Sequence, residues 1–232
     1  LRADWQWAWE HNHDTGAYTP DPVSSGRRAL AGQALAMLCL AADGDAVWPG
    51  KAYQRVKDAG NMTDRENALQ ALLGCGHPLA ARALEGFYAR FRHEALVVDK
   101  WFALQARAPD VAGSALPAVL ALMQHPDFTL KNPNRARSLL FGFCSGNPAG
   151  FHRADGAGYT FWAGQVLALD AINPQVAARL ARTMDAWARL AEPWRGAARE
   201  AIARVAAHPK LSNDVREVVT RALADQPAPT DA

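Results

Sequence analysis

The stretch "SSGRRALAGQALAMLCLAA", residues 24–42, carries the pattern that decides the fold class of this chain. Its apolar residues recur three or four positions apart, at Leu30, Ala34, Met37, Leu38 and Ala41. This spacing places them on one face of an α-helix, because the helix completes a turn about every 3.6 residues. Ser24 or Ser25 is the predicted N-cap. The stretch therefore predicts an amphipathic helix that buries one face.

The same periodicity continues along the chain. In "NMTDRENALQALLG", residues 61–74, Thr63 and Glu66 have the spacing of a capping box, and Gly74 is the predicted stop. Further helices are predicted at 78–92, 93–107, 111–124, 134–144, 158–170, 174–190, 194–207 and 211–224. No run of alternating β-branched residues is present, so no strand is predicted.

Proline-containing pairs mark the turns between these helices. His-Pro pairs stand at 77–78, 125–126 and 208–209, and Asn-Pro pairs at 132–133, 147–148 and 173–174. Proline fits the first turn of a helix, and the residue before it is pushed out of helical geometry. Many helices joined by short turns predict an all-α fold, a superhelix (α-solenoid) of stacked antiparallel helix pairs of the HEAT or armadillo kind.

Three segments are expected from this pattern. Residues 1–24 should hold the end of a helix and a loop, residues 25–224 the α-solenoid, and residues 225–232 a disordered tail. The chain begins with Leu1 rather than Met, so we expect it to be a piece of a longer polypeptide.

Composition argues against a nucleic-acid or membrane partner. The 232 residues include 25 basic and 23 acidic ones, a formal net charge of +2. No apolar run approaches the roughly eighteen residues of a spanning helix, and no signal peptide opens the sequence. Cys39, Cys75 and Cys144 are widely spaced without a CxxC pair, which predicts free thiols in a reducing compartment. We therefore expect a cytoplasmic protein.

No catalytic or metal-binding motif is complete. His93 and Glu94 begin an HExxH pattern, but Val97 stands where the second zinc ligand must be. Ser114 and Ser145 lack the GxSxG context of an activated nucleophile. We therefore expect no catalytic residue and no metal-ligand set in this chain.

The stretch "RADGAGYTF", residues 153–161, raises the question of a phosphate-binding loop. Gly156 and Gly158 form a GxG pair, but the third glycine of the dinucleotide fingerprint is missing and the pair follows a helix rather than a strand. The favoured interpretation is a tight turn with positive φ that leads into the next helix.

Polar and basic residues gather around the helix predicted to begin near Asn173, its expected N-cap. Gln175 and Arg179, four positions apart, share one face close to the helix N-terminus, which favours anions. Arg135 and Arg137 open an earlier helix. Such side chains can meet a carboxylate or a peptide carbonyl. They can equally contact solvent and form an intramolecular ion pair, and spacing alone leaves both interpretations open.

Four segments, in this order along the chain, closely resemble the C-terminal domain of bacterial aminopeptidase N, a zinc-dependent alanyl aminopeptidase of the HExxH gluzincin family. They are "NMTDRENALQALL" (61–73), "VVDKWFALQA" (97–106), "HPDFTLKNPNRARSLLFGFCSGNPAGFHRADGAGYTF" (125–161) and "NPQVAARLA" (173–181). The resemblance extends from about residue 25 to 224, whereas residues 1–24 match only loosely.

The resemblance implies a helical domain that closes over a thermolysin-like catalytic domain of the same polypeptide and leaves a cavity for short peptides. The family's zinc motif, GAMEN motif and transition-state tyrosine belong to that catalytic domain. The chain alone is therefore expected to be inactive and without a cofactor, with zinc in the full-length enzyme. By the same resemblance Gln175 and Arg179 would line the substrate cavity, with Arg135 and Arg137 as further candidates.

An alternative hypothesis makes the chain a stand-alone α-solenoid that binds protein partners along its concave face. It predicts a natural polypeptide of about this size, whereas the aminopeptidase hypothesis predicts a product several times larger.

Overall fold

The computed structural model describes residues 1–13 and 16–224, and every regular element in these ranges is a helix. The prediction of an all-α fold is thereby confirmed. The chain divides into two compact units, Leu1–Leu104 and Gln105–Ala232. The tail predicted at 225–232 lies outside the described residues.

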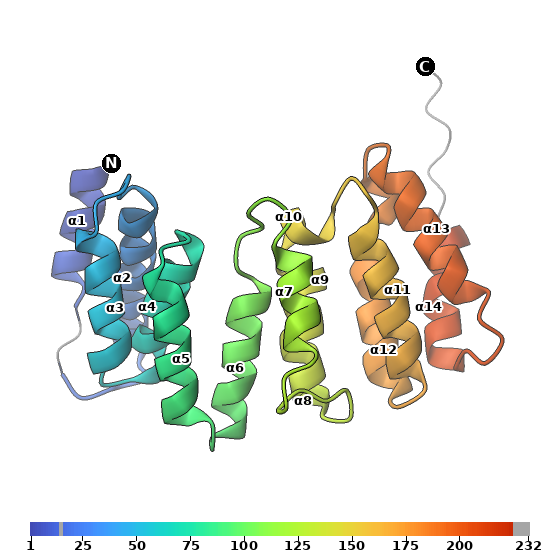
Figure 1. Cartoon of the computed structure of the whole chain (residues 1–232), viewed down its shortest axis with the longest axis horizontal. Helices are drawn as coiled ribbons and strands as arrows, with labels where there is room; N and C mark the ends of the chain where they lie inside the picture. Colours follow the sequence, from blue (N-terminus) through green and yellow to red (C-terminus); the bar gives the residue numbers. More distant parts are fainter. Residues whose placement is uncertain (14–15, 225–232) are drawn as a thin grey trace. The chain divides into compact units, whose positions relative to one another are not determined.

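The N-terminal unit is built from helices that pack against their chain neighbours (Figure 1). They are α1 (Arg2–His11), α2 (Pro22–Leu40), α3 (Val47–Asp58), α4 (Met62–Gly74), α5 (Leu79–Phe91) and most of α6 (Ala95–Ala106). The long α2 packs against α1 and α4, and α3 packs against α4 and α5. Residues 1–24, predicted to be a helix end and a loop, contain the whole of α1 and the start of α2.

The sequence patterns do not predict α3, although it is a regular helix of 12 residues. Pro49 and Gly50 stand in its first turn, a position where proline removes no intrahelical hydrogen bond. Trp48, Ala52 and Val56 form its buried face. Packing of these three side chains stabilises a helix that its local residues signal only weakly.

The predicted N-caps of α2 and α4 are wrong for a common reason. The carboxylate of Asp21 accepts from the N–H of Ser24 at 3.0 Å, so α2 begins before either predicted serine. The side-chain oxygen of Asn61 accepts from the N–H of Asp64 at 2.9 Å, and Thr63 lies inside α4. Asp and Asn are at least as effective N-caps as Ser and Thr, and here they stand earlier in the chain.

The buried face of α2 differs from the predicted one. Ala34 and Leu38 are buried, but Leu30 is 41% exposed and Met37 is half-buried. The buried residues of the helix are Arg28, Ala31, Ala34, Leu35, Leu38 and Cys39. Because α2 packs against α1 as well as α4, its buried stripe follows the positions of these neighbours rather than the apolar residues alone.

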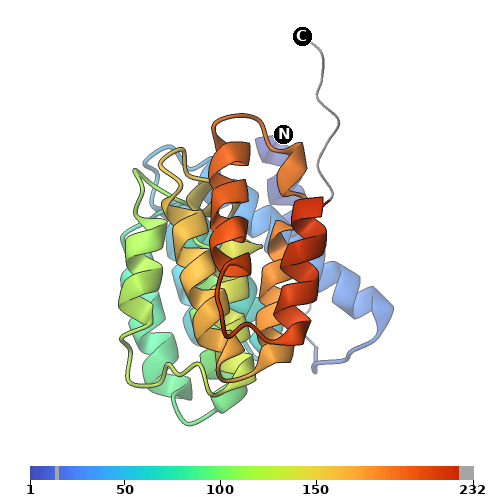
Figure 2. The ribbon, with the colours of Figure 1, turned by 90° about the vertical axis from the view of Figure 1, so that its right-hand side faces the viewer.

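The C-terminal unit begins with α7 (Ala115–Leu122) and a series of short elements. These are α8 (Pro133–Ala136), the π-helix η1 (Arg137–Phe141), α9 (Gly142–Cys144) and α10 (Pro148–Phe151). A four-helix group follows, made of α11 (Ala157–Asp170), α12 (Pro174–Ala181), α13 (Trp194–Ala206) and α14 (Asn213–Ala224). Between α12 and α13 lie the 3₁₀ turns η2 (Arg182–Met184) and η3 (Trp187–Arg189). α11 packs against α12 and α13, and α14 packs against the same two helices (Figure 2).

Three predicted helices of this unit are shorter or interrupted. The helix predicted at 111–124 begins only at Ala115, because two residues shortly before it have φ of 51° and 82°, which no right-handed helix admits. The helix predicted at 134–144 contains the π-helical η1. The helix predicted at 174–190 leaves α-helical geometry after Ala181 and continues as 3₁₀ turns.

The Gly-rich turn joins α10 to α11 through a close backbone contact. Gly156 has φ of 69°, so the predicted positive-φ turn is confirmed at this residue. At Gly158, in the first turn of α11, a Cβ atom would lie 2.0 Å from the carbonyl oxygen of Phe151. Further along α11, the buried Trp162 donates from Nε1 to the carbonyl of Leu180 at 3.0 Å. The turn thus positions the helix against which α12 packs.

The same turn contains a pH-sensitive contact. Nδ1 of His152 lies 2.9 Å from the hydroxyl of Tyr159, and burial lowers the pKa of His152 below its ordinary 6.5. The unfolded chain therefore binds a proton at a higher pH than the folded one. Stability contributed by neutral His152 is complete above about pH 6.5 and is lost as the pH falls from there toward the folded-state pKa.

We expect His152→Gln to reduce the acid sensitivity of the fold. Urea unfolding followed by circular dichroism at about pH 7.5 and about pH 5.5 should show a smaller loss of unfolding free energy in the variant than in the wild type. The other histidines are common to both proteins and cancel in this comparison. An equal loss in the two proteins would contradict the assignment.

Candidate functional site

α12 separates an apolar face, packed in the C-terminal unit, from an exposed polar face. Asn173 is its N-cap, as predicted, and its side-chain oxygen accepts from the N–H of Val176 at 3.2 Å. The buried residues of the helix are Val176, Ala177, Leu180 and Ala181. Gln175 and Arg179 lie on the exposed face, four positions apart. The helix thus holds an amide and a guanidinium together at the surface.

A pocket of about 400 Å³ lies beside this polar face. Three elements of the C-terminal unit and the residue that follows α12 line it: Arg137 of η1; Gln175, Ala178 and Arg179 of α12; Arg182; and Asp214, Glu217 and Val218 of α14. The structure therefore brings together three of the four residues singled out in the sequence, namely Gln175, Arg179 and Arg137.

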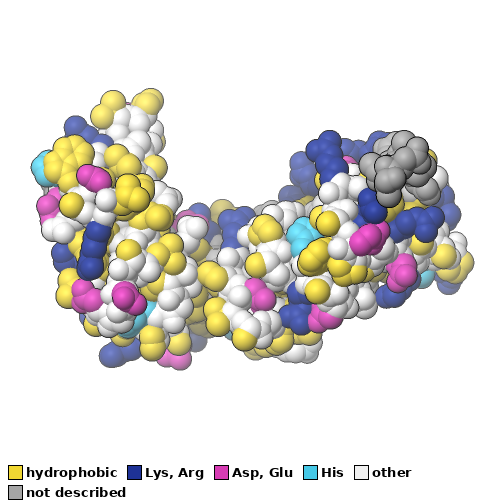
Figure 3. Space-filling view, turned by 90° about the horizontal axis from the view of Figure 1, so that it is seen from above, with side chains coloured by type: hydrophobic (Ala, Val, Ile, Leu, Met, Phe, Trp, Pro, Cys, Tyr) yellow, Lys and Arg dark blue, Asp and Glu magenta, His cyan; other side chains and the backbone are white. Residues whose placement is uncertain are grey.

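The charged side chains of this pocket are exposed to solvent. Arg137, Arg179 and Arg182 are all exposed, as are Asp214 and Glu217. Among residues 1–13 and 16–224, none of these five forms an ion pair within 4.0 Å. Figure 3 shows Lys and Arg side chains gathered on the C-terminal unit. A guanidinium group that forms no ion pair within the protein can bind a carboxylate of a ligand through two parallel hydrogen bonds.

Arg135 does not line this pocket. Its side chain is buried at 6% exposure, and Nη1 donates to the carbonyl of Asp127. The side-chain oxygen of Asn132, the N-cap of α8, accepts from the N–H of Arg135 at 3.3 Å. Arg135 therefore ties the turn before α8 to the core of the unit, while Arg137, two positions later, faces the pocket.

Three charged residues of the pocket were not singled out in the sequence. Arg182 stands three positions after Arg179 and seven after Gln175, so helical spacing could have found it. Asp214 and Glu217 come from α14, and only the packing of α14 against α12 brings them to the pocket. Their carboxylates give the pocket both signs of charge, with one more cation than anions.

The side chains that commonly bind metal ions are dispersed over the described residues. In the part of the chain that the structure describes, no three or more His, Cys, Asp or Glu side chains come together as metal ligands would. The pocket beside α12 contains no His or Cys and only two carboxylates, too few for a catalytic zinc, which takes three protein ligands. Across the described residues, no helix has both the length and the apolar character to span a membrane.

Stacked helix pairs without a strand in the described ranges define a helical-repeat domain. Residues 1–224 match the family described as "Domain of unknown function (DUF3458_C) ARM repeats". The chain therefore belongs to this family, the C-terminal ARM-repeat domain of the aminopeptidase N type.

Named relatives agree with this assignment. The chain is 40% identical over 208 residues to aminopeptidase N of Caulobacter vibrioides, covering 90% of this chain and 24% of that protein. It is 38% identical over 167 residues to aminopeptidase N of Escherichia coli K12, covering 72% of this chain and 19% of that protein. The crystal structure of Legionella pneumophila aminopeptidase A in complex with aspartic acid superposes with a TM-score of 0.84 at 28% identity, over 97% of this chain and 27% of that one. The chain thus spans about a quarter of the length of these relatives or less.

Proposed function

We propose that this chain is the capping and substrate-access domain of a cytoplasmic zinc metalloaminopeptidase that removes N-terminal residues from short peptides. The zinc and the catalytic residues would lie in a thermolysin-like domain of the same polypeptide, and this domain alone would be inactive. The proposal is supported by the family assignment and by the likeness to aminopeptidase N over 90% of the chain.

The observation that carries the domain's own role is the pocket beside α12. Its Arg137, Arg179 and Arg182 are exposed, and within the described residues they have no ion-pair partner. An aminopeptidase holds the peptide N-terminus at its catalytic centre, so the free end that can reach another domain is the C-terminal carboxylate. Arginine is permanently charged and cannot act as a general base, but it can hold that carboxylate and position the peptide.

Arg179→Gln in the full-length enzyme is expected to raise KM for a free-acid tetrapeptide such as tetra-alanine by about tenfold, the loss of one charge-assisted hydrogen bond. kcat should change little, because the interaction is the same in the ground and transition states. The C-terminal amide of the same peptide should show no such increase. Steady-state kinetics with the two peptides measures both effects.

Arg189→Gln is the matched control, since Arg189 is exposed in η3 and does not line the pocket. It should leave both KM values within about twofold of the wild type. An equal rise of KM for the acid and the amide, or an effect of Arg189→Gln as large as that of Arg179→Gln, would contradict carboxylate binding by this pocket.

A further inference from the structure

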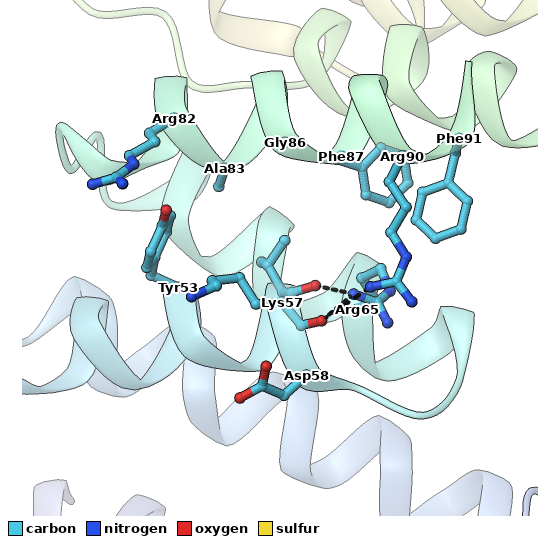
Figure 4. Close-up of a pocket in the computed structure, with 11 residues that line it drawn as sticks. Tyr53, Lys57, Asp58, Arg65, Arg82, Ala83, Gly86, Phe87, Arg90 and Phe91 are labelled. Carbon is cyan, nitrogen blue, oxygen red and sulfur yellow. Dashed lines mark hydrogen bonds between the residues drawn. The ribbon is translucent and has the colours of Figure 1, made fainter.

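A second pocket, of about 310 Å³, lies within the N-terminal unit, between α3 and α5 (Figure 4). Its volume is at the lower end of the range for small-molecule sites. Eleven residues line it, among them four cations, one carboxylate and three aromatic rings. The cations are Lys57, Arg65, Arg82 and Arg90. This composition differs from that of the pocket beside α12, which has no aromatic residue.

Two guanidinium groups meet at one end of this pocket. Arg65 is buried at 5% exposure, and its Nη1 donates to the carbonyl of Lys57 at 2.9 Å. Arg90, from α5, donates to the same carbonyl at 3.2 Å. Figure 4 shows the two side chains side by side next to Phe91. Burial, and after it the charge of Arg90, lowers the pKa of Arg65, so the two cations disfavour one another. An anion placed against them would relieve that repulsion.

Aromatic rings accompany the cations at both ends of the pocket. The guanidinium carbons of Arg65 and Arg90 lie 5.6 Å and 5.4 Å from the centre of the Phe91 ring. At the other end the Tyr53 ring lies between Arg82, at 5.8 Å, and Lys57, at 5.9 Å (Figure 4). The walls therefore offer flat apolar surface together with positive charge.

The single carboxylate of the pocket, that of Asp58, raises the pKa of Arg65 by its charge but forms no ion pair within 4.0 Å among the described residues. Asp58 accepts a hydrogen bond from Nε2 of Gln54, and Figure 4 shows its carboxylate turned away from Arg65 and Arg90. Among the described residues, neither Lys57, Arg82 nor Arg90 has an ion-pair partner within 4.0 Å. Gly86, an exposed lining residue on α5, has open space beside it, since an added Cβ there would meet no atom within 4 Å.

From this juxtaposition we infer that the pocket between α3 and α5 binds a small aromatic carboxylate. The carboxylate hydrogen-bonds to Arg90 and is attracted by the charge of Arg65, whose buried guanidinium already donates to three backbone carbonyls. The ring packs on Phe91, beside the open space at Gly86. This site is separate from the pocket beside α12, and the inference does not depend on the proposed peptidase function.

The test is a titration of the ¹⁵N-labelled 232-residue chain with 3-phenylpropionate, followed by amide and arginine side-chain NMR shifts. Saturable shifts confined to α3, α5 and Arg65 are expected. The neutral 3-phenylpropionamide and the ring-free propionate should each bind at least about tenfold more weakly. The amide lacks the negative charge, and propionate lacks the aromatic ring.

Two variants localise the site without touching the structural contacts of Arg65. Arg90→Gln should weaken binding about tenfold. Gly86→Leu should weaken it by a similar factor, because the new side chain would occupy open space beside a lining residue of the pocket. The control is Arg92→Gln, the same charge change two residues away on an exposed side chain outside the pocket, which should alter binding by less than about twofold.

Several results would overturn the inference. One is equal binding of the carboxylate and its amide, and another is the absence of saturable shifts at α3 and α5. Loss of affinity in Arg92→Gln equal to that in Arg90→Gln would mean nonspecific attraction by charge. Phenyl phosphate binding tenfold more tightly than 3-phenylpropionate would make the ligand a phosphate rather than a carboxylate.

Discussion

Replacing Gly158 with alanine is expected to destabilise the C-terminal unit by at least about 4 kcal/mol. The added Cβ would lie 2.0 Å from the carbonyl oxygen of Phe151, and the three atoms nearest to it are all backbone atoms of this last residue of α10, which no side-chain rotation can move. The two elements must separate to admit it, which would also disturb the buried Tyr159 and Trp162 in the same helix. Thermal unfolding of the purified chain, read by near-ultraviolet circular dichroism, measures the effect.

Gly164→Ala is the matched control, since it lies in the same helix and an added Cβ there meets nothing within 4 Å. It should leave stability unchanged or raise it by about 0.5–1 kcal/mol, because alanine favours a helix over glycine. A Gly158→Ala protein with the midpoint of the wild type would show that α10 and α11 do not approach as closely as described.

Replacing Arg65 with methionine is expected to cost the N-terminal unit about 3 kcal/mol. Its guanidinium donates to the carbonyls of Val56 and Lys57, in the last turn of α3, and to that of Ala59, the residue after the helix. Carbonyls at the end of a helix have no intrahelical partner. Methionine retains much of the apolar stem but leaves these carbonyls without their donor. Urea unfolding measured at two wavelengths gives the change in free energy.

Arg82→Met provides the comparison for this substitution. Arg82 is exposed, lines the same pocket and contacts Tyr53 only through its charge, at 5.8 Å from the ring centre. Its loss should change stability by no more than about 0.5 kcal/mol. Equal effects of Arg65→Met and Arg82→Met would mean that the carbonyl hydrogen bonds contribute little and that the stem of Arg65 carries its contribution.

The helices were largely predictable because their signal is local. The apolar spacing in 24–42 and the Asn173-Pro174 start of α12 both lie within a few residues of the structure they specify. Where a prediction was wrong or missing, either a nearby residue was the better cap or packing between helices decided the outcome. Asp21, rather than either predicted serine, is the N-cap of α2. Burial of Trp48 stabilises α3 although proline and glycine stand in its first turn.

The candidate site also combines features that the sequence predicts with features that only the structure shows. Gln175 and Arg179 share a helix face by spacing alone, so their proximity was predictable from the sequence. Whether an arginine faces solvent or the core was not predictable. Arg135, in α8, is buried, whereas Arg137, the first residue of the π-helix η1, lines the pocket. Burial depends on which carbonyls the fold brings near each guanidinium.

The sequence by itself determined the all-α class, most of the helices and the exposed face of α12, because periodicity and caps act over a few residues. Only the tertiary structure decided the partners of Arg65, the contact that excludes a side chain at Gly158, and the carboxylates that α14 adds beside Arg179. These features join groups from different helices, and no pattern within one helix records which surface of another will cover it.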